Sequence, residues 1–239
     1  FWFLVWRDIL VRYKQTVIGV AWSMIRPLIT MVVFTVVFGK LAKLPDSGMP
    51  YPLLVFAAML PWNFFSNALS EGSGSLVGNA NLVTKVYFPR IIIPVSSIIV
   101  ALVDFVISLV IMAGIMVWYV YLPDWRIFLL PLFLLLACLP VAGAGFWFAA
   151  LNVRYRDFRY VVPFIHQLGL YVSPVGFSSS IVPEQWRLFY ALNPMVGIID
   201  GFRWALLRGS VELHWAGLLL STALSLLLLI SGLWYFRKT

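Results

Sequence analysis

The chain has 239 residues, of which 62% are hydrophobic and only 11% are charged, and its mean hydropathy is +0.96. A soluble globular chain is about 45–50% apolar and about 25% charged, so this chain has too few polar side chains to cover a surface that faces water. Its net charge of +8 comes from basic residues scattered near the ends of apolar runs. That distribution favours anionic lipid headgroups, and not nucleic acid, as the partner. The single cysteine, Cys138, excludes a disulfide framework or a multi-cysteine metal site.

Residues 1–26 have the pattern of a helix that lies on the membrane. Apolar side chains recur at steps of three and four along one face and polar side chains along another, which indicates an amphipathic interfacial helix. An ordinary first span is disfavoured because Arg7, Asp8, Arg12 and Lys14 fall within eight positions. We expect Arg7, Arg12 and Lys14 to reach lipid phosphates at the membrane surface.

Six apolar segments are candidates for membrane spans, each needing roughly 20 residues to cross a bilayer. They cover about residues 27–44, 51–69, 91–121, 127–151, 161–177 and 215–236. The predicted fold is therefore an all-α membrane protein with one interfacial helix and six transmembrane helices. We expect the whole chain to form one transmembrane domain, divided into 1–26, 27–177, 178–213 and 214–239.

The segment 178–213 is apolar but repeatedly interrupted. It contains Pro183, Asn193-Pro194, Gly197 and Gly201, so it is too broken to span and too hydrophobic for a free loop. Short re-entrant or interface-lying helices fit it best, provided that protein buries their backbone.

The distribution of Lys and Arg predicts the orientation. With the N-terminus in the cytoplasm, eleven of the seventeen basic residues lie inside: Arg7, Arg12, Lys14, Arg26, Lys85, Arg90, Arg154, Arg156, Arg159, Arg237 and Lys238. Six lie outside: Lys40, Lys43, Arg126, Arg187, Arg203 and Arg208. The excess inside favours a multi-pass membrane protein with both termini cytoplasmic.

The motifs of common catalytic chemistry are absent. The chain has no G-x-x-x-x-G-K-[ST] phosphate loop, no H-E-x-x-H and no G-x-S-x-G. Two polar residues within predicted spans, Asp104 and His166, are candidates for substrate passage or a proton relay. The simpler interpretation, which we favour for both, is a side chain packed and hydrogen-bonded between helices.

Aromatic residues are abundant and suggest what such a membrane protein handles. Belts at the membrane surface explain most of the eleven Trp, but not the group in and before the broken segment, which includes Tyr171, Phe177, Trp186, Tyr190 and Trp204. Flat rings suit the C–H faces of sugars and would make a track for a glycan. In the second span, Asn63 and Asn67 lie on one face beside Trp62 and Phe64. The two amides either line a polar path or join helices by hydrogen bonds.

Several motifs, taken together, resemble the polysaccharide-exporting permeases of ABC transporters, a family that exports O antigen, capsule and wall teichoic acid. They are RDIL at 7–10, RY at 12–13, GVAW at 19–22, Pro27, LPWNFFSN at 60–67, NLVTKVYFPR at 81–90, LNVRYRD at 151–157, SPV at 173–175 and LNPM at 192–195. The resemblance covers nearly the whole chain, and the motifs follow one another in the family's order.

The resemblance implies a homodimer of permeases with two cytoplasmic ATPase subunits, which would bind ATP and Mg²⁺. This chain would hold no cofactor or metal and would not itself be an enzyme. The substrate would be a polyprenyl-pyrophosphate-linked polysaccharide, whose pyrophosphate Arg7, Arg12 and Lys14 would contact. The inner segments 71–90 and 154–159 would contain coupling helices and 178–213 the outer gate helices. The coupling residues would be Lys85, Tyr87, Phe88, Arg90, Arg154, Arg156, Asp157 and Arg159.

Three alternatives stay open from the sequence. An ABC exporter of a small lipid or drug is the closest. A membrane-embedded glycan-processing enzyme would need clustered carboxylates or a metal motif, and the inner loops beyond Asp8 hold only Glu71 and Asp157 as acids. A secondary transporter would show two repeats with paired broken spans, and the chain has one broken segment.

Overall fold

The computed structural model describes residues 2–14, 17–45, 48–85, 88–155 and 157–239, without the side chains of residues 13, 14, 17–23, 83 and 84. All regular structure in these residues is helical, which confirms the all-α prediction. The helices are α1 (Trp2–Lys14), α2 (Val17–Phe34), the π-helical η1 (Thr35–Leu41), α3 (Tyr51–Gly78), α4 (Ala80–Lys85), α5 (Ile92–Trp118), the 3₁₀ η2 (Trp125–Leu129), α6 (Leu130–Arg154), α7 (Phe158–Val172), the 3₁₀ η3 (Ser179–Ile181), α8 (Glu184–Tyr190), α9 (Pro194–Leu206) and α10 (Trp215–Lys238).

Five helical segments of the described chain are long and apolar enough to cross a membrane: Met24–Leu41, Tyr51–Gly78, Ile92–Trp118, Trp125–Arg154 and Trp215–Lys238. The predicted fifth span, 161–177, instead forms α7, which has 15 residues. A helix of that length reaches about 22 Å, less than the roughly 30 Å of a bilayer core. It ends before Pro174, which has no backbone N–H to continue the helix, so the prediction of six spans is not confirmed.

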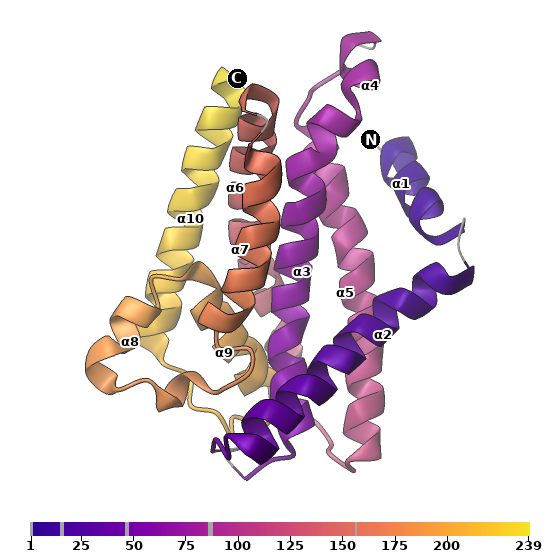
Figure 1. Ribbon diagram of the computed structural model, residues 1–239. Coiled ribbons are helices and arrows are strands. Elements are labelled where there is room, and N and C mark those ends of the chain that lie inside the picture. Colours follow the sequence, from indigo (N-terminus) through magenta and orange to yellow (C-terminus); the bar gives the residue numbers. More distant parts are fainter. Residues whose placement is uncertain (1, 15–16, 46–47, 86–87, 156) are drawn as a thin grey trace.

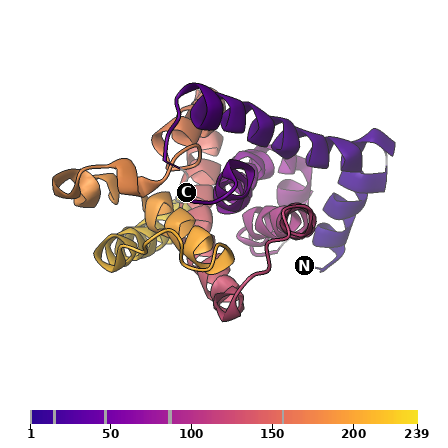
Figure 2. The same ribbon diagram turned by 90° about the horizontal axis from the view of Figure 1, so that it is seen from below.

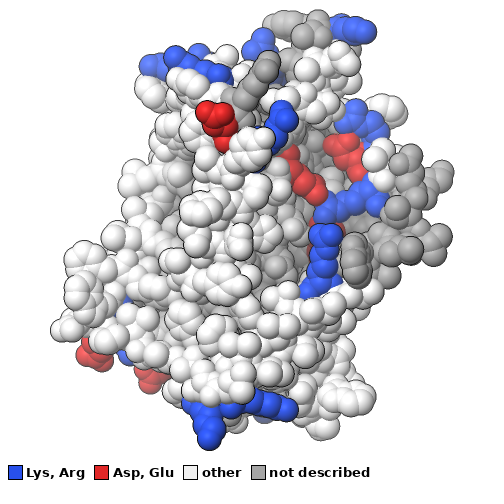
Figure 3. Space-filling view, in the orientation of Figure 1, with Lys and Arg blue, Asp and Glu red and all other residues white. Residues whose placement is uncertain are grey.

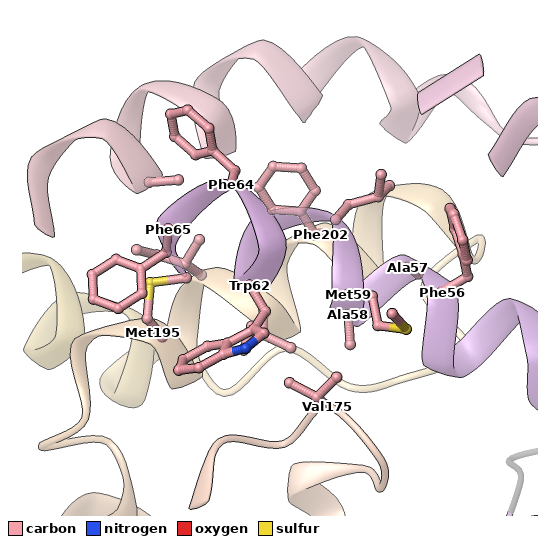
Figure 4. Close-up of a cluster of buried hydrophobic side chains, with 14 of the residues drawn as sticks. Phe56, Ala57, Ala58, Met59, Trp62, Phe64, Phe65, Val175, Met195 and Phe202 are labelled. Atoms are coloured by element: carbon pink, nitrogen blue, oxygen red, sulfur yellow. The ribbon is translucent and has the colours of Figure 1, made fainter. Parts of the chain in front are cut away.

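Helix α3 is the centre of the bundle. Every side chain from Leu53 to Trp62 is buried, because α3 packs against α2, α5, α6, α7 and α9. Figure 4 shows the cluster that results: Trp62 and Phe65 of α3 lie beside Met195 of α9, and Phe64 projects from another side of α3. A helix that is apolar all round and fully enclosed by other helices has little lipid-facing surface.

Helices α6 and α10 pack closely because glycines lie at their contact. A Cβ on Gly143 would lie 2.7 Å from backbone atoms of Leu228 and Leu229, and one on Gly232 would lie 2.5 Å from the Gly143 carbonyl. Small residues let the backbones of membrane helices approach in this way. One turn away, the Trp147 and Tyr235 rings stack with 4.4 Å between their centroids, which fixes the register of the pair.

The N-terminal part differs from the prediction in its helix boundaries. The predicted interfacial helix over 1–26 is two helices in the structure, since α2 begins at Val17 and continues through Pro27 to Phe34. Pro27 therefore lies inside a helix and does not start one. In Figure 1, α2 runs obliquely across the bundle while α1 lies against the upper part of α5.

The connections between the long helices fall at the two ends of the bundle. Helix α4, the α6–α7 connection and the C-terminus lie at the upper end in Figure 1, and the α2–α3 and α5–α6 connections lie at the lower end. Figure 3 shows charged side chains at both ends and along α1, with a broad uncharged surface between them. The uncharged band has the composition expected of a surface in contact with lipid tails.

The segment 178–213 is broken into short helices, as its prolines and glycines predict. Asn193 begins α9, and its side chain accepts a hydrogen bond from the Met195 N–H at 3.0 Å, an N-cap that suits Pro194 in the next position. Helix α9 is buried along almost its whole length. Helix α8 projects sideways from the bundle in Figures 1 and 2 and is largely exposed.

Candidate functional site

An ion-pair cluster joins α1 to the bundle. The Arg12 guanidinium pairs with Glu71 of α3 through Nη1 and with Asp104 of α5 through Nη2, the latter at 2.6 Å. Nearby, Arg7 bonds to Asp8 at 2.7 Å and to the Asn79 side chain at 2.9 Å. In Figure 3 acidic and basic side chains meet between α1 and the bundle. The cluster therefore fixes α1 against α3 and α5.

This arrangement bears on the predicted contacts with phosphate. Both Arg7 and Arg12 are half-buried and engaged by carboxylates in this conformation. Three acids, Asp8, Glu71 and Asp104, face these two cations, so the described cluster has a formal charge of −1 and does not attract an anion. The side chain of Lys14 lies outside the described residues. A role for these residues at phosphate stays a prediction.

Asp104 and His166 occupy different settings. Asp104 is buried in α5 and held by Arg12, which agrees with the favoured structural interpretation of a side chain packed between helices. The sequence pattern did not reveal that its partner is Arg12 of α1. His166 lies half-buried in α7. The described residues contain no group of three or more His, Cys, Asp or Glu arranged to hold a metal.

The predicted path residues of α3 differ in exposure. Trp62 is 2% exposed and its ring packs against Gly169 of α7, while Phe64 packs edge-on against Phe105 of α5, with 5.9 Å between centroids. Both lie inside the single chain in this conformation (Figure 4). Asn63 and Asn67 are half-buried. The structure thus brings Trp62 to α7 but leaves neither Trp62 nor Phe64 on a surface.

Helix α7 presents an aromatic stripe, which we define as Tyr160, Phe164, Leu168 and Tyr171. These side chains are all exposed, Tyr160 by 79%, and their spacing of four, four and three places them on one helix face. The sequence prediction named only Tyr171 and missed Tyr160 and Phe164. The spacing was visible in the sequence, but 161–177 was interpreted as a membrane span. The sequence alone does not show which face of such a helix packs against the protein.

The remaining predicted aromatics surround the outer helices. Trp186 of α8 is largely exposed, whereas the Tyr190 hydroxyl donates to the Val172 carbonyl at 2.8 Å. Phe177 packs against Tyr190 with 6.4 Å between centroids. Trp204 of α9 lies beside the Arg126 guanidinium, 4.8 Å from its ring centroid. Tyr190 thus joins α8 to the end of α7 and to the segment after it, and Trp204 joins α9 to η2. A gate in this segment stays a prediction.

Sequence reasoning missed Arg203, which it counted among the outer cations. Arg203 is 0% exposed, and its guanidinium donates to the carbonyls of Leu54, Phe177 and Val175 at 3.0, 2.7 and 2.9 Å. Asp200, one turn earlier, is also buried, and burial raises its carboxyl pKa to about 6. Because carbonyl acceptors leave no mark in a sequence, only the fold reveals that Arg203 joins α9 to α3 and to the 173–177 segment.

The predicted coupling residues lie at the end of the bundle that carries α4 and the α6–α7 connection. Lys85 ends α4, Phe88 is half-buried, and Arg90 is exposed just before α5. Arg154 ends α6, while Asp157 and Arg159 flank the start of α7, all exposed. Tyr87 and Arg156 lie outside the described residues. The two segments are thus available to a partner at one end of the molecule.

The fold and these features define a multi-pass helical membrane protein, and the described residues contain no group of side chains arranged to hold a metal ion. Residues 1–207 match the family model described as ABC-2 type transporter, so the chain belongs to the membrane subunits of that transporter family. The family assignment confirms the resemblance seen in the motifs.

The chain is similar to three named relatives over most of its length. It is 29% identical over 203 residues to the O-antigen export system permease protein RfbA of Myxococcus xanthus, covering 84% of this chain and 77% of the relative. It is 25% identical over 236 residues to RfbA of Klebsiella pneumoniae, covering 97% and 88%. It is 22% identical over 215 residues to the polysialic acid transport protein KpsM of Escherichia coli, covering 86% and 80%.

Proposed function

We propose that this chain is the membrane subunit of an ATP-driven exporter that moves a lipid-linked polysaccharide, such as O antigen, capsule or teichoic acid, across the bacterial inner membrane. The named relatives are permeases for O antigen and polysialic acid. The aromatic stripe of α7 is the structural observation that supports a glycan as cargo. The three exposed rings of the stripe offer weak stacking sites of similar strength, so a polymer can slide along them without being trapped.

The proposed assembly is a homodimer with two cytoplasmic ATPase subunits. Exposed apolar side chains of α2 and η1 lie near the stripe's Tyr171, whose ring lies 6.1 Å from Phe34; they include Ile29, Val32 and Val33 of α2 and Val36 and Val37 of η1. A second copy packed on α2 and α7 would convert two such faces into an enclosed path closed by α8 and α9. Both termini would then be cytoplasmic, and ATP with Mg²⁺ would be bound by the partner.

Coupling to the ATPase is proposed to run through α4 and the α6–α7 connection. Phe88→Ala is the test substitution. Phe128→Ala is the control, because Phe128 is 82% exposed in η2, beside the α5–α6 connection, which lies at the opposite end of the bundle from α4 (Figure 1). We expect Phe88→Ala to weaken ATPase co-purification and ATP-driven glycan export severalfold with normal membrane insertion, and Phe128→Ala to change neither.

Two outcomes would overturn the proposal. Glycan translocation by this chain in proteoliposomes without an ATPase, driven by a proton gradient, would identify a secondary transporter. ATP-driven efflux of a small amphiphile, with no export of glycan by cells that contain the chain and its ATPase, would identify the small-molecule exporter.

A further inference from the structure

A cavity of about 460 Å³ lies where the last turns of α3 pass the end of α6 and the start of α7. It is separate from the aromatic stripe and from the ion-pair cluster of α1. Its wall includes Ser70, Ser73, Gly74, Asn152, Arg159 and Val162. Its volume lies within the roughly 300–1,000 Å³ of small-molecule sites.

The glycines of this wall do not serve helix packing. A Cβ on Gly74 or Gly78 would meet nothing within 4 Å, whereas one on Gly143 or Gly169 would collide with a neighbouring helix. Glycine inside a helix costs about 1 kcal/mol relative to alanine. Close contact between helices offsets that cost at Gly143 and Gly169, but at Gly74 the glycine only keeps space open.

A buried acceptor lines the same space. Asn152 is 9% exposed, and its Nδ2 donates to the Ser73 carbonyl at 2.8 Å. Its Oδ1 has no hydrogen-bond partner among the described residues. Leaving a buried acceptor unpaired costs about 1–3 kcal/mol, so Asn152 is poised for a donor such as a hydroxyl of a bound molecule.

The cavity also has a cation without a carboxylate partner. Arg159, in the first turn of α7, is exposed and forms no ion pair with any described residue. Arg7 and Arg12, in contrast, are held by acids. A free guanidinium binds a phosphate with two parallel hydrogen bonds, so Arg159 adds an anion site to the hydroxyl site at Asn152.

We infer that this cavity binds a phosphorylated sugar, with a sugar hydroxyl donating to Oδ1 of Asn152 and the phosphate on Arg159. The apolar Val162 faces the sugar ring, and Gly74 leaves room for it. The inference rests on the proposed function, in which the ligand is the sugar diphosphate end of the lipid-linked glycan. A phosphatidylglycerol headgroup has the same chemistry, a phosphate beside hydroxyls, and is the other source.

The test is binding to the full chain in nanodiscs of uncharged lipid. The probe is farnesyl diphosphate-linked N-acetylglucosamine, compared with farnesyl diphosphate and with added phosphatidylglycerol. Gly74→Leu places a side chain in the cavity, and its Cβ meets no other atom within 4 Å. Gly114→Leu is the control, since Gly114 is also a helical glycine whose Cβ would meet nothing, but it lies in α5. We expect Gly74→Leu to weaken binding of the sugar probe at least tenfold and Gly114→Leu to leave it unchanged.

Further comparisons test the contact with the phosphate and the contact with the sugar hydroxyl separately. Arg159→Gln should weaken binding about tenfold, Arg159→Lys should retain part of it, and farnesyl diphosphate should bind more weakly because it lacks a donor for Asn152. Gly74→Leu should melt no lower than the natural chain, and if it fails to fold, Arg159→Gln carries the test. Equal binding to the natural chain and both variants would overturn the inference. Tighter binding of phosphatidylglycerol than of the sugar probe would overturn the sugar assignment.

Failure of the inference is distinguishable from failure of the proposed function. Undiminished glycan export in cells with Gly74→Leu would overturn the cavity's role and leave the exporter assignment intact. Absence of any associated ATPase with the natural chain would overturn the exporter assignment, whatever the cavity binds.

Discussion

The Arg12 guanidinium in α1 lies 2.6 Å from the Asp104 carboxylate in α5 and also pairs with Glu71 in α3. One cation thus lies between two acids of different helices. We expect Arg12→Gln to lower the stability by about 3 kcal/mol, because two carboxylates then face each other without a counter-charge. Thermal unfolding in detergent measures the loss.

A neutral variant is the control for that ion cluster. Arg12→Gln combined with Glu71→Gln and Asp104→Asn has no unpaired charge, and its amides can hydrogen-bond to one another. We expect it to be more stable than Arg12→Gln alone. The opposite order, with the neutral variant less stable than the single one, would show that the carboxylates are stabilised by groups other than Arg12.

The contact of Trp62 with Gly169 provides a test of α3–α7 packing. A Cβ on Gly169 would overlap the Trp62 indole ring, which is enclosed and has no free space to move into. Gly169→Ala should therefore destabilise the protein by about 1–3 kcal/mol through overpacking. Gly114→Ala, where a Cβ meets nothing, should raise stability by up to about 1 kcal/mol. Equal melting temperatures for the two variants would contradict this packing.

Long apolar runs were predictable from the sequence, whereas helix ends and partners were not. The spans around α5, α6 and α10 follow from hydropathy alone. The second span was predicted to end at about residue 69, before Glu71-Gly72-Ser73, but α3 continues to Gly78. Residues 71–73 remain helical because Glu71 pairs with Arg12 and because Gly72 and Ser73 are buried. Those stabilising contacts come from α1 and α6, far away in the sequence.

The candidate site was also predictable only in part from the sequence. Aromatic composition predicted Tyr171 and Tyr190 as members of a glycan-handling region, but helix rotation was needed to separate the exposed Tyr171 from the buried Trp62. The role of Arg203 depends on three carbonyls, and those acceptors exist at every residue of a chain. A sequence therefore predicts which side chains are available, and the fold decides which of them meet.

Arg203 should be the most sensitive residue of the outer helices. Arg203→Met would remove the donor to the carbonyls of Leu54, Val175 and Phe177. The Leu54 carbonyl lies within α3 and keeps its helical hydrogen bond, so the cost of about 1–3 kcal/mol for each unpaired acceptor applies to Val175 and Phe177. Arg203→Lys should recover part of the loss, because one ammonium cannot reach three separated acceptors as a guanidinium does. Thermal unfolding and proteolysis within 173–177 measure the effect. The exposed Arg208→Met is the control, with an expected change below about 1 kcal/mol, and a loss as large as that of Arg203→Met would contradict the assignment.

Asp200 should make stability depend on pH. Burial raises its pKa from 3.8 to about 6 in the folded chain, so the folded protein holds a proton that the unfolded chain releases between these values. Stability should fall by about 3 kcal/mol as the pH rises from 4 to 6 and stay level above that range. Asp200→Asn cannot ionise and should remove this fall, while the exposed Glu212→Gln should preserve it. The same small cavity is lined by Tyr190, Arg187 and His214, and Arg203 lies one turn away from Asp200. Because the natural chain and Asp200→Asn share these groups, the effect of Asp200 is read as the difference in stability between the two proteins at each pH. If Asp200→Asn lost stability at pH 7, an ionised Asp200 would be stabilising Arg203, and burial would not be the dominant influence on this carboxyl.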